Sequence, residues 1–209
     1  MIYGVLLAAG RSARMGQPKQ LLTWRGRPLV RHAAETALAS RLAGLVVVLG
    51  AEAPAVRAAL AGMGGPVQTV ECADYSAGQA ASLRCGLAAL PGSARAAVVL
   101  LVDQPLVGPE LLDRLIDAFE ADPAALAVVP RYQGRRGNPA LLAAGLFDEL
   151  RELAGDTGAR ALLERHAGRV RWLDWPDPAV LLDADTPEAY ARLRDSDEGR
   201  GEHASPRPS

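Results

Sequence analysis

The sequence predicts a three-layer α/β/α fold built around a mainly parallel sheet. Short, continuous apolar runs alternate along the chain with longer amphipathic or Ala-rich stretches, which is typical of buried parallel strands joined by helices. Composition agrees, because the 209 residues include 49% hydrophobic and 22% charged side chains with a formal net charge of −1. A chain of this length and balance is an ordinary globular protein with one domain.

The first two thirds of the chain show the alternation most clearly. The apolar runs predict strands at Ile2–Leu7, Leu45–Leu49, Val67–Val70, Ala97–Val102 and Leu126–Val129. The stretches between them predict helices at Leu29–Ala39, Pro54–Ala61, Gly78–Leu90 and Pro109–Glu120. Such regular alternation favours a doubly wound sheet with helices on its faces.

The last third is less regular. We expect helices at Pro139–Leu150 and Gly158–His166, strands at Val170–Leu173 and Val180–Leu182, and a last helix at Pro187–Arg194. From about Asp195 to Ser209 the chain is polar, contains Gly, Ser and Pro, and has no apolar period, so we expect a disordered tail. The domain would then span residues 1–194 and the tail residues 195–209.

Composition also excludes several classes of protein. No run approaches the about 18 apolar residues of a membrane helix, and the N-terminal apolar run lacks the basic stretch of a secretory signal. A net charge near zero argues against a nucleic-acid partner. Cys72 and Cys85 are too few for a disulfide scaffold or a four-ligand zinc site, so we expect two buried small side chains in a reducing cytoplasm.

A glycine-containing loop follows the first predicted strand and carries the only lysine of the chain. Lys19 stands alone among 23 basic residues, of which all the others are arginine. Ligands of open α/β sheets bind beyond the carboxyl ends of the strands. Small residues there let backbone N–H groups approach an anion, and the cations of Arg14 and Lys19 suit phosphate oxygens. The alternatives are a triphosphate cradle and a tight turn with solvated basic residues.

Two common phosphate loops do not match this segment. The dinucleotide fingerprint requires Gly-x-Gly-x-x-Gly, which the order Gly10-Arg11-Ser12 breaks. A Walker A loop requires four residues between its glycines, whereas five separate Gly10 from Gly16, and Lys19 is followed by Gln20.

The segment LLAAGRSARMGQPKQLL resembles the N-terminal signature of nucleotidylyltransferases, and is most similar to the molybdenum cofactor cytidylyltransferases and MobA-like transferases. The resemblance implies the Rossmann-like fold of the nucleotide-diphospho-sugar transferases. It also implies that Lys19 and Arg14 act catalytically by neutralising the departing pyrophosphate. The form Ala-Ala-Gly favours CTP over GTP, although sugar-nucleotide enzymes share the alanine. By the same resemblance, the loop residues that bind the nucleotide together with Lys19 are Ala8, Ala9, Gly10, Arg11, Ser12 and Gly16.

Two acidic positions are candidate metal ligands. Asp103 directly follows the long apolar run that ends at Val102, which places it at the mouth of the site, although Asp-x-Pro also suits a turn. Asp185 precedes Thr186-Pro187, where it could simply cap a helix. Phosphoryl chemistry usually recruits Mg²⁺, which prefers carboxylate oxygens. The resemblance implies that Asp103 and Asp185 hold Mg²⁺, with Asp183 a weaker candidate ligand. It also implies that Asp103 is a catalytic residue.

Three further segments match the family pattern. Gly78, Ser82 and Arg84 open a predicted helix and are expected to border the nucleotide, although packing and surface roles explain them equally well. The loop Gly134–Pro139 could simply be an exposed turn. In the motif Gly155–Arg160, Asp156 could simply cap a helix. The resemblance implies that they bind the acceptor through Arg136, Gly137, Asn138, Asp156 and Arg160.

The resemblance covers about residues 3–194 and implies a function. The protein would transfer CMP from CTP to the phosphate of molybdopterin-type molybdenum cofactor, releasing pyrophosphate, and a molybdoenzyme client is a further possible partner. A near alternative is the same chemistry with GTP or another NTP, or on a sugar phosphate or another small phosphorylated acceptor. A distant alternative is a non-catalytic protein that delivers the molybdenum cofactor.

Overall fold

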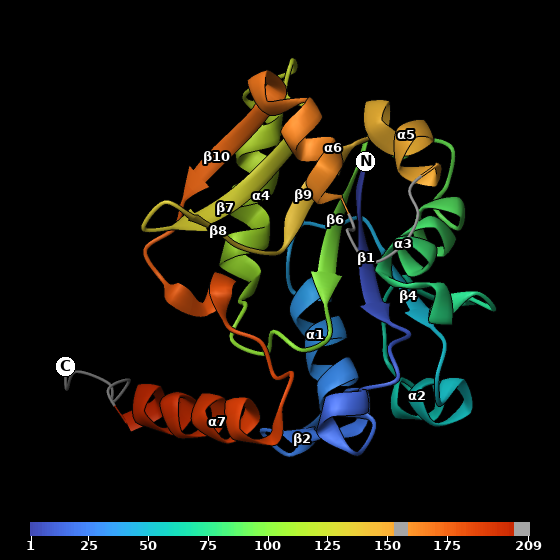
Figure 1. Cartoon of the computed structure of the whole chain (residues 1–209), viewed down its shortest axis with the longest axis vertical. Helices are drawn as coiled ribbons and strands as arrows, with labels where there is room; N and C mark the ends of the chain where they lie inside the picture. The colour runs from blue at the N-terminus through green and yellow to red at the C-terminus, as the bar shows by residue number, and fades with distance from the viewer. Residues whose placement is uncertain (153–158, 203–209) are drawn as a thin grey trace.

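The computed structural model describes residues 1–152 and 159–202 of the chain and contains a central eight-stranded mixed sheet (Figure 1). Its strands lie in the order β10-β7-β9-β6-β1-β4-β5, with β8 paired to β7. In this sheet, as far as the described residues go, only β9 and β8 run antiparallel to their neighbours, so the predicted α/β fold with a mainly parallel sheet is confirmed. The strands are β1 (Ile2–Ala8), β4 (Leu45–Leu49), β5 (Val67–Glu71), β6 (Ala96–Leu101), β7 (Ala127–Tyr132), β8 (Arg135–Arg136), β9 (Ala140–Ala143) and β10 (Val170–Asp174).

Helices cover both faces of the sheet. On one face α1 (Leu29–Leu38) packs on β1 and β4 and also touches α4 (Pro109–Glu120), which covers β7, β9 and β10. On the other face α3 (Gln79–Ala88) packs on β1 and β4 and touches α5 (Phe147–Arg151). The remaining elements are α2 (Ala53–Ala59), α6 (Arg160–Arg165), α7 (Pro187–Glu202) and a separate hairpin of β2 (Thr23–Trp24) and β3 (Arg27–Pro28).

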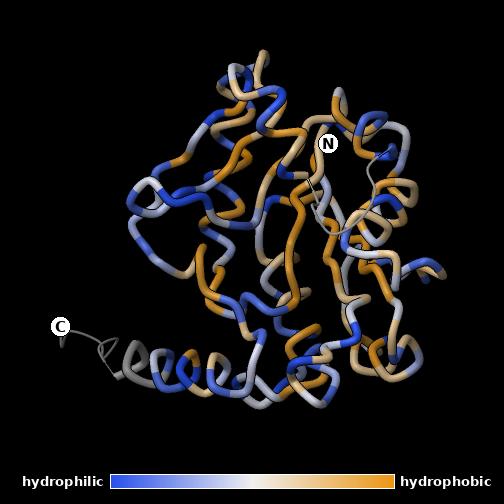
Figure 2. Tube along the Cα trace, in the orientation of Figure 1, coloured by the Kyte–Doolittle hydropathy of each residue, from blue (hydrophilic) through white to orange (hydrophobic). Residues whose placement is uncertain are grey.

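The central strands are apolar over their whole length because helices cover them on both sides (Figure 2). Leu6 of β1 is fully buried and pairs with Val47 of β4 on one side and Leu100 of β6 on the other. This register brings the carboxyl ends of β1, β4 and β6 to one edge of the sheet. The loops that follow β1 and β6 therefore open on the same side of the molecule.

Two of the expected elements are wrong. The segment expected as one helix over Pro139–Leu150 instead forms strand β9 and then the short α5. Ala140–Ala143 is buried between β6 and β7, so tertiary pairing overrides the helix propensity of Ala and Leu. The strand expected at Val180–Leu182 is a 3₁₀ turn at Pro178–Leu181, because Asp177 caps it by accepting from the Ala179 N–H at 2.8 Å.

The end of the chain and the cysteines also differ from expectation. Helix α7 continues to Glu202, into the segment expected to be a tail, and its Asp197 pairs with Arg25 after β2. Residues 203–209 of that expected tail lie outside the described residues. Cys72 and Cys85 form a disulfide with a Cα–Cα distance of 5.7 Å rather than two thiols. The two cysteines meet because the fold places the end of β5 beside α3. Their separation of 13 residues in the sequence does not predict this contact.

Among the residues that the structure describes, no helix combines the length and the apolar character needed to cross a membrane.

Gly86 tests the close packing of α3 on the sheet. A Cβ at this position would lie 2.4 Å from Val5 Cγ1 and 2.9 Å from Val48 Cγ2. Gly86→Ala is therefore expected to lower the free energy of unfolding by about 1–3 kcal/mol, although the same change in an exposed helix raises it by up to about 1 kcal/mol. Urea unfolding measures the difference, and Gly92→Ala, where no atom lies within 4 Å of an added Cβ, is the control. A stabilised Gly86→Ala protein would contradict this packing.

Candidate active site

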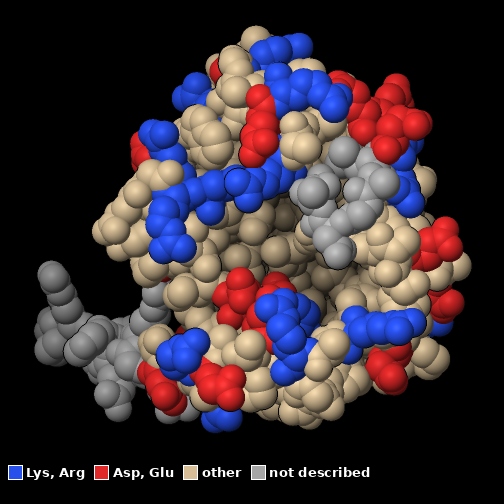
Figure 3. Space-filling view, viewed as in Figure 1, with Lys and Arg blue, Asp and Glu red and all other residues tan. Residues whose placement is uncertain are grey.

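A cleft of about 680 Å³ opens beyond the carboxyl ends of β1 and β6. Figure 3 shows this face hollowed, with acidic and basic side chains gathered along the lower border of the hollow and a band of basic side chains along its upper border. A second cavity of about 470 Å³ adjoins the cleft along Gly10, Arg11 and Tyr75. The cleft is lined by Leu7, Ala9, Gly10, Arg11, Arg14, Lys19, Tyr75, Ser76, Gly78, Gln79, Ser82, Leu101, Val102, Asp103, Asp183 and Asp185.

The loop after β1 wraps one end of this cleft. It turns through the short 3₁₀ segment Ala13–Met15, which is bracketed by left-handed residues Ser12 (φ 55°) and Gly16 (φ 68°). A left-handed serine is unusual, and here its side chain is held, because Ser12 Oγ accepts the Lys19 N–H at 3.0 Å. The turn therefore sets where the backbone of Lys19 lies.

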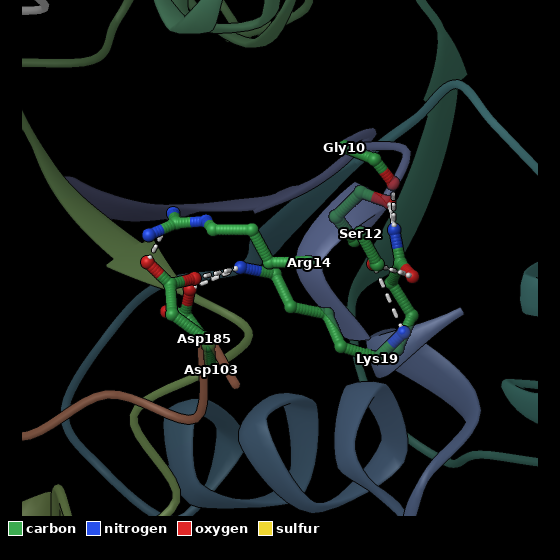
Figure 4. Close-up of polar contacts among 8 residues, drawn as sticks. Gly10, Ser12, Arg14, Lys19, Asp103 and Asp185 are labelled. Carbon is green, nitrogen blue, oxygen red and sulfur yellow. Dashed lines mark hydrogen bonds and ion pairs between the residues drawn. The ribbon is translucent and has the colours of Figure 1, made fainter. Parts of the chain in front are cut away.

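Lys19 places its ammonium between two carboxylates (Figure 4). Its Nζ donates to Asp185 Oδ1 at 2.8 Å and to a carboxylate oxygen of Asp103. The Lys19 and Asp103 side chains keep only 16% and 12% of their exposure, so water screens the pair weakly. Burial alone would lower the pKa of Lys19, but the two carboxylates outweigh it and raise that pKa.

Arg14 completes the charge cluster from the solvent side. Its guanidinium donates to the second oxygen of Asp185 at 2.7 Å, while its side chain remains largely exposed. Burial would raise the pKa of Asp185, but the contacts with Lys19 and Arg14 lower it, so this carboxylate stays ionised. Two negative and two positive charges thus lie together at the mouth of the cleft.

Backbone contacts explain how two distant carboxylates meet. The Ala184 N–H donates to the Asp103 carbonyl at 2.8 Å, which ties the segment before α7 to the loop after β6. On the other side of that loop, His32 Nε2 donates to the Pro105 carbonyl at 2.9 Å. Burial lowers the pKa of His32, so its ring is neutral and serves as a fixed donor. Both contacts hold the position of Asp103.

The carboxylate pair has the chemistry of a divalent-metal site. Asp103 Oδ1 is buried and has no hydrogen-bond partner among the described residues, which leaves one hard oxygen for a cation. Within the same part of the chain, no group of three or more His, Cys, Asp or Glu side chains could hold a metal alone. Mg²⁺ commonly binds one or two carboxylates together with water and substrate phosphates. Asp103 and Asp185 therefore fit a metal whose remaining ligands come with a nucleotide.

Asp183 lines the same cleft but differs in charge state. Partial burial raises the pKa of Asp183, and the neighbouring charges of Asp185 and Asp103 raise it further. Its electrostatic surroundings therefore favour ionisation less than those of Asp185. Asp183 remains a weaker candidate for metal binding on electrostatic grounds.

A second group of basic residues lies on β8 and at the start of α6. Partial burial and the nearby guanidinium of Arg160 both lower the pKa of Arg136, so the two guanidinium groups repel each other. The adjoining Gly137 packs against Val180, where an added Cβ would lie 2.6 Å from the Val180 carbonyl oxygen. The Asn138 N–H donates to that same carbonyl at 2.9 Å. The fold thus fixes the Arg136 loop against the 3₁₀ turn at Pro178–Leu181.

The family model for the MobA-like NTP transferase domain matches residues 4–170 of the chain. The chain belongs to this family. Nicotine blue oxidoreductase of Paenarthrobacter nicotinovorans is 37% identical over 92% of this chain and 96% of its own length. Purine catabolism protein PucB of Bacillus subtilis is 33% identical, with the same two coverages.

Solved structures agree with this assignment. Rv0371c of Mycobacterium tuberculosis H37Rv superposes with a TM-score of 0.79 at 40% identity, covering 93% of this chain and 98% of that one. A second structure of Rv0371c is a complex with manganese, and superposes with a TM-score of 0.77 at 38% identity over the same shares of both chains. The Rossmann-like fold expected from the sequence is confirmed. The protein is thus a MobA-like nucleotidyltransferase, in a family that typically uses a divalent metal.

Most residues that the sequence singled out meet in this MobA-like transferase. Lys19, Arg14, Asp103 and Asp185 form the charge cluster, and Ala9, Gly10, Arg11, Gly78 and Ser82 line the same cleft. Ser12 and Gly16 line the adjoining cavity, and Ala8 contributes a buried carbonyl to the loop.

The other expected residues lie elsewhere. Arg84 is half-buried and does not line the cleft. Arg136, Gly137, Asn138 and Arg160 also lie outside the lining of the cleft, and Arg136 and Arg160 form the second basic group. Asp156 lies outside the described residues.

Sequence reasoning missed three residues that border or support the cleft. Tyr75 and Gln79 line it, and Arg11 lies over the Tyr75 ring at 5.6 Å from its centroid. Tyr75 lies just before the predicted helix that starts at Gly78, and Gln79 lies in its first turn, which was a usable signal. Gln20 is fully buried beneath the loop, and its polarity beside Lys19 gave no indication of that burial.

The position of Lys19 predicts an unusual effect on metal binding. Lys19→Met keeps an apolar stem but removes the cation that the carboxylates share. Since an ammonium this close is worth at least about 1 kcal/mol, we expect Mn²⁺ to bind roughly tenfold more tightly in the absence of nucleotide. Calorimetric titration with Mn²⁺ measures this, and Arg57→Met, which removes an exposed cation paired with Glu71, should leave the affinity unchanged. Weaker Mn²⁺ binding by Lys19→Met would show that the carboxylates do not form the metal site.

Proposed function

We propose that this MobA-like transferase moves CMP from CTP to the terminal phosphate of molybdopterin-type molybdenum cofactor and releases pyrophosphate. The observation that carries the proposal is the convergence of Lys19 and Arg14 with Asp103 and Asp185 beside a glycine-containing loop. Cations suited to phosphate oxygens and carboxylates suited to a metal occur there within one charge cluster.

The chemistry requires positioning and charge stabilisation more than proton transfer. An oxygen of the acceptor phosphate forms a bond to the α-phosphorus of CTP while the bond to the β-phosphate oxygen breaks and pyrophosphate leaves. The attacking phosphate is already ionised, so no strong general base is needed. Lys19 and Arg14 stabilise the charge that develops on the leaving pyrophosphate. Mg²⁺ held by Asp103 and Asp185 would supply further neutralisation of the phosphate oxygens.

The preference for CTP is supported by the sequence Ala8-Ala9-Gly10 at the start of the loop. A phosphorylated acceptor is supported by the second basic group. The guanidinium groups of Arg136 and Arg160 repel each other, and the Arg160 pair with Glu164 at 3.0 Å offsets part of that repulsion; a phosphate beside Arg136 would offset more of it while accepting charge-assisted hydrogen bonds. In this proposal Gly137 and Asn138 shape the loop that carries Arg136, and Asp156, outside the described residues, is included on the resemblance alone.

The name of one relative suggests a redox activity as another candidate function, which an activity assay can detect. Nicotine blue oxidoreductase is named for a redox reaction, whereas the loop of this chain, Gly10-Arg11-Ser12, departs from the dinucleotide fingerprint. A redox activity would require a nicotinamide or flavin cofactor, which the assay can supply directly.

Pyrophosphate release from each of CTP, GTP, ATP and UTP, with and without molybdenum cofactor, tests the function. We expect release with CTP and Mg²⁺ only when the cofactor is present, and none after chelation of the metal. Release with GTP, or with a sugar phosphate as acceptor, would assign the near alternative. Cofactor binding without release would indicate a delivery protein for a molybdoenzyme, and NAD(P)H oxidation without release would indicate a redox enzyme.

Lys19→Met and Asp103→Ala test the two kinds of charge separately. Lys19→Met removes one preorganised charge-stabilising donor, so it should cut the turnover number by about 10² or more while the fold is retained. Asp103→Ala should be inactive even at high Mg²⁺ concentration. Steady-state kinetics measure both effects, and wild-type turnover in Lys19→Met would remove the role that we give to this ammonium.

Arg136→Gln tests the acceptor site. Since a hydrogen bond to a charged group is worth about 1.5–3 kcal/mol, we expect the KM for the acceptor to rise at least about tenfold while the KM for CTP stays constant. Arg135→Gln is the matched control, because adjacent strand residues point to opposite sides. A rise in the KM for CTP instead would place Arg136 on the nucleotide side.

A further inference from the structure

Gln20 is a fully buried amide that touches the phosphate loop at three points. Its Nε2 donates to the Ala8 carbonyl at 2.9 Å and to the Gly10 carbonyl at 2.6 Å, and its Oε1 accepts from Ser12 Oγ at 3.3 Å. The side chain has no exposed surface. Both of its amide hydrogens and its oxygen are therefore used within one loop.

These contacts determine which way the loop presents its N–H groups. In a trans peptide the carbonyl and the following N–H point in opposite directions. Because Gln20 holds the Gly10 carbonyl, the Arg11 N–H points away from the buried amide, and Gly10 and Arg11 both line the cleft. The Ala9 carbonyl is likewise held by the Ala51 N–H at 3.1 Å, which turns the Gly10 N–H away from Ala51.

The two N–H groups remain available for a ligand. Within the described part of the chain, neither the Gly10 N–H nor the Arg11 N–H donates to a protein acceptor. Consecutive backbone N–H groups directed to one side form an anion-binding concavity. The arrangement thus depends on a side chain below the loop that the ligand itself never touches.

Gln20 also links this concavity to the catalytic ammonium. Ser12 Oγ donates to Gln20 and accepts the N–H of Lys19, so one short chain of hydrogen bonds joins the loop to the backbone that carries Nζ (Figure 4). Ser12 itself has a left-handed backbone that needs such support. A change at Gln20 would therefore disturb the loop N–H groups and the position of Lys19 together.

We infer that Gln20 is a positioning residue that holds the phosphate loop in its pyrophosphate-binding form. It acts through the backbone of Gly10 and Arg11 and through Ser12, not by contact with the nucleotide. This inference rests on the proposed function, because it requires that the loop receives the phosphates of a nucleoside triphosphate.

Binding of inorganic pyrophosphate in the presence of Mg²⁺ tests the inference in the full-length protein. Gln20→Met keeps the buried volume but removes both donors, and should weaken pyrophosphate binding at least about tenfold. The KM for CTP should rise with it, while the KM for the acceptor stays at the wild-type value. Gln68→Met, the same change at an exposed position of β5, is the control and should bind pyrophosphate normally.

Gln20→Glu keeps the shape of the side chain, loses the paired donors and guards against a Met variant that fails to fold. It should lose pyrophosphate affinity while its thermal unfolding midpoint shows a folded protein. Wild-type affinity in either folded variant overturns the inference, and so does an equal loss of pyrophosphate and acceptor binding. If the wild-type protein binds neither pyrophosphate nor CTP, the proposed function fails and the inference fails with it. If it binds both but releases no pyrophosphate, only the proposed reaction fails.

Discussion

The site depends on one shared ammonium. Lys19 Nζ joins Asp103 and Asp185, which lie 84 and 166 residues further along the chain. Two carboxylates this close repel each other, and the ammonium between them offsets that repulsion in the free protein. The glycine loop, the loop after β6 and the segment before α7 therefore form one unit.

The sheet makes this unit possible. Parallel strands β1 and β6 end at the same edge, so the loops after Ala8 and Leu101 begin side by side there. Asp185 comes from outside the sheet and needs the backbone bond between Ala184 and Asp103 to reach that edge. The buried strands position the two loops, and the loops position the charged side chains. A substitution that shifts α3 or β1 would therefore also shift Lys19.

Sequence reasoning succeeded where burial and spacing determine structure locally. Continuous apolar runs predicted β1, β4 and β6, because strands covered on both faces carry no polar residues. It failed for β9, since the sequence Ala-Leu-Leu-Ala has helix propensity and becomes a strand only by pairing with β6 and β7. The disulfide between Cys72 and Cys85 likewise arises from a contact between elements. Neither fact can be read from a local pattern.

The site shows the same division. Lys19, Arg14, Asp103 and Asp185 were accessible to sequence reasoning because each follows a recognisable strand end or motif. Their mutual contacts were not, since the partner of Lys19 in the free protein is a pair of carboxylates and the expected partner was a phosphate. Gln20 escaped notice because a glutamine beside a lysine normally indicates solvent exposure. Its function follows only from the carbonyls that it holds.

The single lysine has a physical explanation in this arrangement. The ammonium lies between two carboxylates in the free protein, and in the proposed reaction it would exchange them for phosphate oxygens at similar cost. The compact ammonium of lysine on its flexible side chain suits that exchange. A planar guanidinium binds one carboxylate through two parallel hydrogen bonds, and it loses both when it rotates toward another partner. Arg14 contacts Asp185 from the exposed side, where a guanidinium has room. A chain that uses arginine everywhere else thus has lysine at the position where, in the proposed reaction, one cation serves two partners in turn.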